Sequence, residues 1–396
     1  MSSPNPAGGT PSPNAPSTPE EPLQRKKGSR TGTWVAVIVI VVILVGVGVA
    51  YAEGWIFGAK SAKQSINGAG STFVAPLQDK WETTYTAASV NYAAIGSGAG
   101  IQQITAKTVD YGATDAPLTG TQKALAPGIQ QFPDSAGGVA VIYNVPGVTS
   151  TTPIQFNGTV LAEIFLGQIT SWNDARLQSI QASGVTLPNH AIVCVSRSDG
   201  SGTTFVFTSY LAKESTVWAT GPGHGTSVKF PVGVTAKGSS GVTTDVQTTA
   251  GAIGYVDLEY ALANNVTFGK VANTVGAYIL PTLASTASAI ADSTQVFPAG
   301  NGDWSNVSIL NSPGPTDYPI TSLTYLLFYQ DLGTAYGSQY SQAKAQALVN
   351  LLEWMITTGQ SYSSALYYVP LPANIVAIDQ TTLHGELYNG QALTVG

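Results

Sequence analysis

The sequence predicts an α/β fold that is large enough for two packed cores and is preceded by a hydrophobic segment. From about residue 66 onward, short apolar runs alternate with helical patterns, which is typical of α/β proteins. The chain has 396 residues, of which 43% are hydrophobic and 10% are charged. This length and composition indicate a large globular protein.

The first 33 residues predict a disordered tail. Seven prolines lie within the first 22 positions, among Ser, Asn, Gly and Thr. Such a composition buries too little apolar surface to offset the entropy lost on ordering.

Residues 34–52 predict a transmembrane anchor. These nineteen residues carry no charge and are rich in Val and Ile. As a helix they would extend about 28 Å, enough to cross a bilayer. Four basic residues between positions 25 and 30 precede the segment, so the positive-inside rule puts the tail in the cytoplasm and the bulk outside. A cleavable signal peptide is the alternative, because Ala50-Tyr51-Ala52 fits a cleavage site.

Residues 53–65 predict a linker. Strand patterns and helical patterns follow each other after it. The strand patterns cover 90–95, 139–143, 192–195 and 253–256. The helical patterns cover 76–86, 203–213 and 338–358.

Charge and cysteine content exclude several classes of function. The formal net charge of -6 and the pI near 5.0 argue against a nucleic-acid-binding surface, which needs clustered Lys and Arg. Cys194 is the single cysteine, which excludes internal disulfides and Cys-based metal sites, and its apolar surroundings in sequence predict a buried small residue. The three histidines show no metal-ligand spacing.

Three loops rich in Gly, Ser and Thr come directly before helical patterns and are potential anion sites. They cover 68–73, 96–100 and 199–204. The first turn of a helix has unpaired backbone N–H groups and a partial positive charge, and glycine lets an anion approach them closely. A single loop of this kind is usually only a turn and a cap, but three in one chain favour a binding function.

Charged residues adjoin these loops. The guanidinium of Arg197 offers paired donors to an oxyanion. Asp199 either holds that guanidinium or caps the following helix. Asp115 precedes Ala-Pro, where a carboxylate taken alone is most often a turn or helix cap.

Two common enzyme motifs are missing from the sequence. No loop ends in the Gly-Lys-Ser/Thr of a nucleotide-binding P-loop, and no Gly-x-Ser-x-Gly elbow occurs. Nucleotide hydrolysis and serine hydrolase activity are therefore not supported.

An ordered set of motifs resembles the PstS family, the phosphate-binding proteins of ABC importers. The set runs from about residue 66 to 372 and comprises 68–73 with Trp81, 96–100, 112–118, 143–147, 164–169 with 172–174, 197–213, 251–256 and 318–321. One departure is Gly98, where the family commonly has a second Ser; a missing hydroxyl there would loosen the site slightly.

The resemblance implies a set of phosphate ligands, with Asp199 bracing Arg197. The implied set is Thr72, the backbone of Phe73, Ser97, Asp115, Arg197, Asp199, Ser201, Gly202 and Thr203. No metal or other cofactor is implied.

The resemblance also implies a two-lobed, periplasmic-binding-protein-like α/β fold with hinge strands, preceded by one N-terminal transmembrane helix. Lobe one would consist of 66–143 and 319–396, and lobe two of 144–318. Such a protein is not an enzyme. It would bind inorganic phosphate between its lobes outside the cell, anchored to the cell membrane by a single pass, and deliver the anion to the permease subunits of an ABC transporter. A phosphate sensor, or a surface protein of the same fold that binds another oxyanion, is the alternative.

Overall fold

The computed structural model describes Val41 and residues 63–395. The predicted tail (1–33), the anchor (34–52, apart from Val41) and most of the linker (53–65) lie outside these residues. None of the described helices combines the length and the apolar character needed to cross a membrane. From Lys63 onward the chain forms one compact unit.

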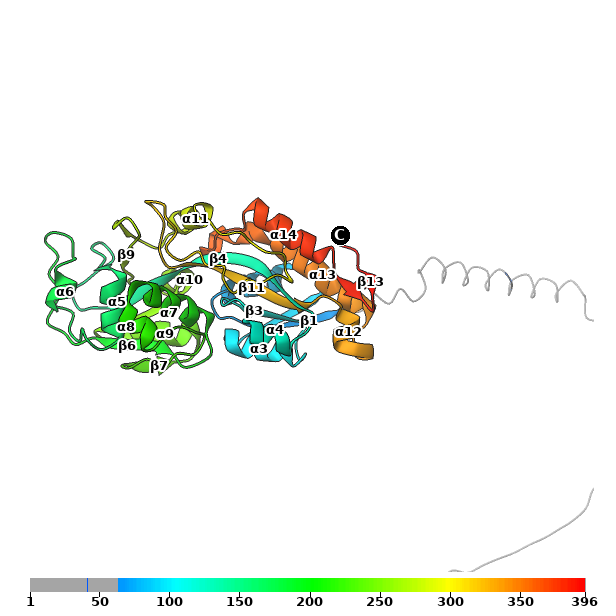
Figure 1. Ribbon diagram of the computed structural model, residues 1–396, viewed down its shortest axis with the longest axis horizontal. Coiled ribbons are helices and arrows are strands. Elements are labelled where there is room, and N and C mark those ends of the chain that lie inside the picture. The colour runs from blue at the N-terminus through cyan, green and yellow to red at the C-terminus, as the bar shows by residue number, and fades with distance from the viewer. Residues whose placement is uncertain (1–40, 42–62, 396) are drawn as a thin grey trace, which may run out of the picture. The chain divides into compact units, whose positions relative to one another are not determined.

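One eight-stranded sheet runs through this unit, in the order β2-β1-β3-β11-β4-β8-β6-β7. Its strands are β1 (Ser65–Gly70), β2 (Ser89–Ala94), β3 (Tyr111–Thr114), β4 (Ile129–Asn144), β6 (Val193–Arg197), β7 (Val234–Ala236), β8 (Ala252–Asp257) and β11 (Thr321–Tyr329). The 16-residue strand β4 pairs with β11 through its first ten residues and with β8 through its last six. It therefore connects two lobes, as Figure 1 shows.

The strand directions make the two halves of the sheet point at each other. Strands β1, β2 and β3 are parallel, and β3 is antiparallel to β11, which is antiparallel to β4. In the other lobe β6, β7 and β8 are parallel, and β8 is antiparallel to β4. The first group therefore runs in the direction of β4 and the second group against it. As a result, the carboxyl ends of both groups lie at the boundary between the lobes.

Helices cover both faces of this sheet, as parallel strands require. They are α2 (Ala75–Thr84), α3 (Ser97–Thr105), α4 (Gly120–Leu125), α5 (Gly158–Phe165), α6 (Ala175–Gln178), α7 (Gly202–Glu214), α8 (Thr216–Thr220), α9 (Gly238–Thr248), α10 (Leu258–Ala263), α11 (Leu283–Ala291), α12 (Leu332–Tyr336), α13 (Gln342–Ile356) and α14 (Ala373–Leu383). Short 3-10 helices cover Gly337–Gln339, Thr358–Tyr362 and Ser364–Leu366, and small sheets are formed by β5 (Gln155–Phe156), β9 (Lys270–Ala272) and β10 (Tyr278–Ile279), and by β12 (Leu387–Tyr388) and β13 (Gln391–Ala392).

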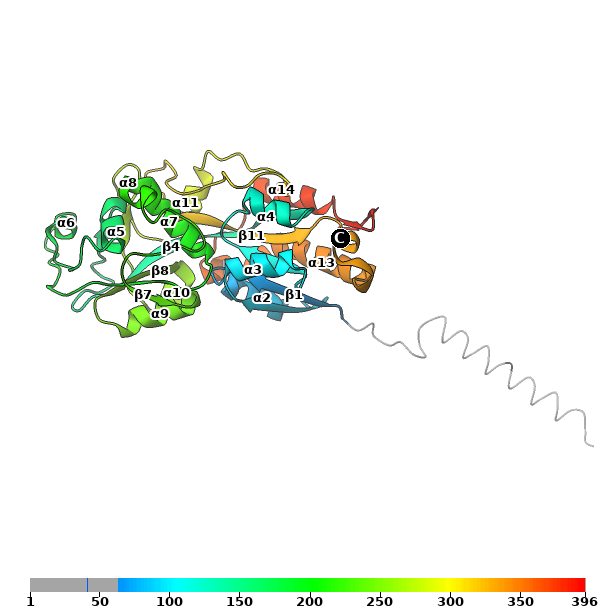
Figure 2. The ribbon, with the colours of Figure 1, turned by 60° about the horizontal axis from the view of Figure 1, so that its bottom comes forward.

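Helices α7 and α9 lie on opposite sides of β8 in the second lobe (Figure 2), and alternating side chains of β8 contact them. The ring of Tyr255 stacks on Phe207 of α7 with centroids 4.3 Å apart. The next residue, Val256, joins an apolar cluster that includes Val242 and Val246 of α9. This alternation of side chains along β8 places α7 on one face of the sheet and α9 on the other. Both helices start at the carboxyl edge of the strands.

The predicted strands and helices are confirmed, although their first and last residues differ from the prediction. Each of the four predicted strands corresponds to a strand of the main sheet, namely β2, β4, β8 and β6. The predicted helices correspond to α2, α7 and α13, although α13 begins only at Gln342, where Ser341 caps it. The prediction missed the first ten residues of β4, because Pro133, Asp134 and two glycines interrupt their apolar pattern. Cys194 is buried, as predicted.

Two carboxyl groups, those of Asp257 and Asp379, are buried without a hydrogen-bond partner in the described part of the chain. Asp379 on α14 is 0% exposed, and neither of its side-chain oxygens has a partner. Burial raises the pKa of Asp379 well above its ordinary value, and the nearby carboxyls of Asp134 and Glu353 raise it further. The folded state therefore holds a proton that the unfolded chain releases near pH 4.

This buried acid predicts a loss of stability as pH rises. A raised folded-state pKa contributes stability that is complete below the unfolded pKa and is lost as pH rises through the folded pKa. Urea unfolding of the parent should give a lower free energy of unfolding at about pH 8 than at about pH 5. In Asp379→Asn this difference should be smaller by about 1–3 kcal/mol.

The matched control for that experiment is Asp303→Asn. Asp303 is exposed, and hydrogen bonds from Ser305 lower its pKa. Asp303→Asn should leave the fall in the free energy of unfolding between the two pH values the same as in the parent. An equally large fall in Asp379→Asn and in the parent would contradict the assignment.

Candidate anion-binding site

Loops from both lobes meet where the two sets of strand ends face each other. In lobe one, the residues that follow β1, β2 and β3 include Thr72, Ser97 and Asp115. In lobe two, the segment after β6 leads through Asp199 into α7. Ligands of α/β proteins commonly bind at the carboxyl ends of strands, so this is the expected position for a site.

Asp115 is the centre of a hydrogen-bonded group in lobe one. The hydroxyl of Ser71 donates to Asp115 Oδ1 over 2.6 Å, and the hydroxyl of Ser97 donates to Oδ2 over 3.4 Å. The backbone N–H of Asp115 donates to Ser97 Oγ over 3.3 Å. Asp115 therefore does not cap α4, whose N-cap is Thr119.

Burial controls the charge of this carboxyl group. Asp115 is 1% exposed, and burial raises its pKa to about 7, although the Ser71 hydroxyl and the charge of Arg197 oppose the rise. Near neutral pH the group therefore exists in both forms. It accepts hydrogen bonds when charged and donates one when protonated.

Arg197 ends β6 and is held by Asp199. Its Nε donates to Asp199 Oδ1 over 2.8 Å, and its Nη2 donates to Oδ2. Burial raises the pKa of Asp199, but the hydrogen bonds and charge of Arg197 outweigh burial, so the net shift is downward. This two-point contact fixes the plane of the guanidinium and leaves its Nη1 beside Ser239 Oγ, at 3.5 Å.

The N-terminus of α7 supplies further donors. Ser201 caps this 13-residue helix, since its hydroxyl accepts from the backbone N–H of Thr204 over 3.0 Å. Asp199 is thus the partner of Arg197 and not the cap. The hydroxyl of Thr203 is 1% exposed and has no hydrogen-bond partner among the described residues.

The two lobes contact each other at these loops. The N–H of Gly202 donates to Ser97 Oγ over 3.1 Å, and the N–H of Gly98 donates to the carbonyl of Gly200 over 2.9 Å. A Cβ atom on Gly202 would lie 2.4 Å from Asp115 Oδ2, so only glycine permits this approach. The lobes are thus closed on each other at the site.

Gly98, where the family pattern has Ser, lies at the closest approach of the two backbones. A Cβ atom on Gly98 would lie 3.0 Å from the Cα of Gly200. A larger residue would therefore have to move the facing loop by a few tenths of an ångström. The predicted loosening of the site stays a prediction.

All nine residues predicted from the sequence lie at this boundary, eight in loops or helix starts and Arg197 at the end of β6. Phe73 differs from the others because its side chain is in the core, while its N–H donates to Ser71 Oγ over 2.9 Å. The sequence reasoning gave no role to three buried neighbours, Ser71, Ser239 and Asp257. A signal for Ser239 was present, because Gly238-Ser239-Ser240-Gly241 is another Gly/Ser loop at a helix start.

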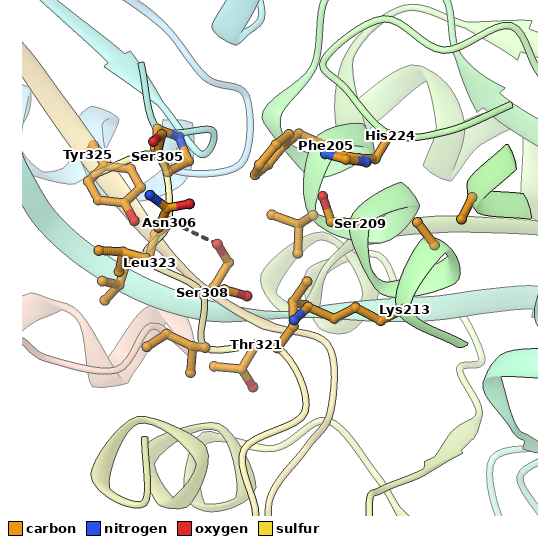
Figure 3. A pocket seen from close by; sticks show the side chains of 18 residues that line it. Phe205, Ser209, Lys213, His224, Ser305, Asn306, Ser308, Thr321, Leu323 and Tyr325 are labelled. Carbon is orange, nitrogen blue, oxygen red and sulfur yellow. Dashed lines mark hydrogen bonds between the residues drawn. The ribbon is translucent and has the colours of Figure 1, made fainter. Parts of the chain in front are cut away.

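A separate cavity of about 480 Å³ lies beside α7, away from these loops. Figure 3 shows Phe205, Ser209 and Lys213 of α7 across the cavity from Ser308 and Thr321. None of the nine predicted residues lines it. In the part of the chain with described coordinates, no cluster of His, Cys, Asp and Glu could hold a metal ion.

Comparison with known families and proteins agrees with the fold. Residues 58–358 match the family described as a PBP superfamily domain. The phosphate-binding protein PstS of Xylella fastidiosa (strain 9a5c) is 40% identical over 325 residues, which cover 80% of this chain and 84% of that protein. PstS of Pasteurella multocida is 35% identical over 342 residues, covering 86% and 95%.

Solved structures show the same fold at lower identity. The periplasmic phosphate-binding protein PfluDING, bound with phosphate, has a TM-score of 0.63 at 23% identity and covers 79% of this chain and 92% of its own. A human phosphate binding apolipoprotein has a TM-score of 0.62 at 22% identity, covering 82% and 99%.

Proposed function

Because this chain belongs to the PstS family of phosphate-binding proteins, we propose that it binds inorganic phosphate between its two lobes and delivers it to an ABC permease for import. The observation that carries this proposal is the place where the loops of the two lobes meet. Arg197, braced by Asp199, and the N-terminus of α7 face Asp115 and Ser97 from the opposite lobe. Together they supply a positive charge, many donors and one strong acceptor to a single buried place.

Each group in this site has a distinct role toward a tetrahedral oxyanion. Arg197 supplies charge through Nη1, the nitrogen that Asp199 does not engage. The first turn of α7, with the hydroxyls of Ser201 and Thr203 and the N–H of Gly202, supplies neutral donors and the positive end of the helix dipole. In lobe one, Thr72, the N–H of Phe73 and the hydroxyl of Ser97 are donors, and Asp115 is the acceptor.

Closure of the two lobes would couple binding to transport. We assign 66–143 with 319–396 to lobe one and 144–318 to lobe two, because β4 changes partner from β11 to β8 at Val139. A ligand favours the closed form only through contacts made to both lobes at once. The proposed donors come from both lobes, so bound phosphate would favour closure, and the closed form would dock on the permease.

The protein performs no chemistry in this proposal and acts outside the cytoplasm. The segment 34–52 would hold it to the membrane by a single pass, which is supported by the length of its uncharged run and the basic residues before it. N-terminal sequencing of the mature protein tests the anchor. A mature chain beginning at Glu53 would identify the segment as a removed signal peptide.

Arg197→Ala tests the proposed site directly. A desolvated charge with paired donors contributes on the order of 2–5 kcal/mol to binding, so the variant should bind phosphate about 30-fold more weakly or worse. Arg197→Lys should recover only part of the loss, because an ammonium lacks the planar fork. Calorimetric titration with phosphate measures both.

The matched control is Arg176→Ala. Arg176 forms ion pairs with Asp174 and Glu163 on the surface, and its side chain is 45% exposed. This variant should bind phosphate like the parent. If Arg197→Ala also kept the parent's affinity, the assigned site would be wrong; a parent that bound no phosphate at all would refute the function.

Asp115 should make the site select phosphate over sulfate. A charged carboxylate repels an anion unless the anion carries a proton to donate, and near neutral pH phosphate has a P–OH group whereas sulfate has none. Asp115→Asn removes the charge and supplies an amide donor. The variant should therefore bind sulfate measurably and lose some preference for phosphate, as competition titrations of both anions would show.

The pKa of about 7 adds a pH dependence to this selectivity. Below that value Asp115 is increasingly protonated and can donate to sulfate. Sulfate should therefore compete better against phosphate at about pH 5.5 than at about pH 8.5 in the parent, while Asp115→Asn should show little change. If Asp115→Asn rejected sulfate completely at both pH values, the selectivity for phosphate over sulfate would have to come from other residues.

A further inference from the structure

The second lobe has another helix start at the same edge, which the proposed site does not use. Helix α9 has 11 residues and follows β7, the strand parallel to β6. Its N-cap, Lys237, gives no side-chain hydrogen bond to the first turn. The N–H of Gly238 donates to Asp199 Oδ1 over 2.9 Å, so the carboxylate that braces Arg197 also receives a backbone donor of α9.

Ser239, the second residue of α9, contacts the proposed site from two sides. Its Oγ lies 3.0 Å from Thr72 Oγ1 in the other lobe and accepts from Nη1 of Arg197 over 3.5 Å. Its backbone N–H donates to Thr72 Oγ1 over 3.3 Å. The side chain is 0% exposed. Ser239 thus lies between the cation of lobe two and a proposed phosphate donor of lobe one.

A second buried polar side chain, that of Asp257, lies close to this serine. Asp257 ends β8 and is 1% exposed, and within the described residues neither carboxyl oxygen has a hydrogen-bond partner. Burial raises the pKa of Asp257 well above its ordinary value, and the carboxylates of Glu259 and Asp115 raise it further. The Ser239 hydroxyl is close enough to oppose that rise.

The protonation state of Asp257 decides what Ser239 offers to a ligand. A charged Asp257 would take the hydroxyl proton of Ser239 as a hydrogen bond and leave only lone pairs toward the cleft. A neutral Asp257 does not take that proton, so Ser239 is free to donate it into the cleft. The surroundings of Asp257 contain carboxylates and the phenol groups of Tyr260 and Tyr368, with Arg197 as the nearby cation, which favours the neutral form.

We propose that Ser239 is a further phosphate-binding residue, which donates its hydroxyl proton to the bound anion while its Oγ accepts from Nη1 of Arg197. The start of α9 is then the second helix N-terminus of lobe two that faces the anion, beside that of α7. This inference rests on the proposed function and extends the ligand set of lobe two from the end of β6 to the end of β7.

Ser239→Ala, Ser240→Ala and Asp257→Asn test the proposal by calorimetric titration with inorganic phosphate. Loss of one donor to a charged ligand should weaken binding about tenfold in Ser239→Ala. Ser240 is its exposed neighbour on the same helix, and Ser240→Ala should bind like the parent. Asp257→Asn replaces the neutral acid by an amide, which also donates, and should stay within about threefold of the parent.

The outcomes separate this inference from the proposed function. If the parent binds phosphate and Ser239→Ala binds it equally well, Ser239 is not a ligand and only the inference falls. If Ser239→Ala and Asp257→Asn are both impaired tenfold or more, Asp257 acts as a charged group and Ser239 does not donate to the anion. A parent that binds no phosphate removes the proposed function itself. Thermal unfolding of each variant should match the parent within a few degrees, and a large drop would assign the effect of Ser239→Ala to packing.

Discussion

The hydrogen-bond ladder of β4 is the constraint on which the other features of this structure depend. One strand pairs with β11 in the first lobe and with β8 in the second, so both lobes share a single twisted sheet. Because β8 runs against β4 while β3 runs with it, the carboxyl ends of six strands must face each other. Helix N-termini start at those ends in both lobes. The anion site thus follows from strand polarity before any individual side chain is considered.

Burial of charge is the second constraint, since the closed cleft buries Arg197 and Asp115 and partly buries Asp199. An isolated buried charge would cost several kcal/mol. The structure avoids this in two ways: Asp199 neutralises Arg197 by a two-point contact, and Asp115 has a raised pKa with two serine hydroxyls beside it. The charges of the cleft are therefore balanced by the protein itself, and an incoming anion meets oriented donors that need little reorganisation.

Glycine makes the closed arrangement sterically possible. Gly98 and Gly200 bring two backbones together, and Gly202 leaves room for the carboxylate of Asp115. A side chain at Gly202 would collide with the Asp115 carboxylate and separate the lobes, which would admit water and weaken the electrostatic contacts in the cleft. The abundance of glycine in the three motifs thus serves both the approach of an anion and the approach of one lobe to the other.

The sequence by itself determined the fold class and the chemical character of the site. Alternating apolar and helical patterns identified α2, β6, α7 and β8, because these signals are local, and the Gly/Ser/Thr loops with Arg197 indicated an anion site. The first half of β4 could not be predicted, since its strand conformation comes from pairing with distant β11. Only the tertiary structure showed that Asp199 pairs with Arg197 and that Asp115 accepts from two serine hydroxyls, and only it brought Ser239 beside Arg197. Their positions depend on strand order and direction, which are set by contacts between segments far apart in the chain.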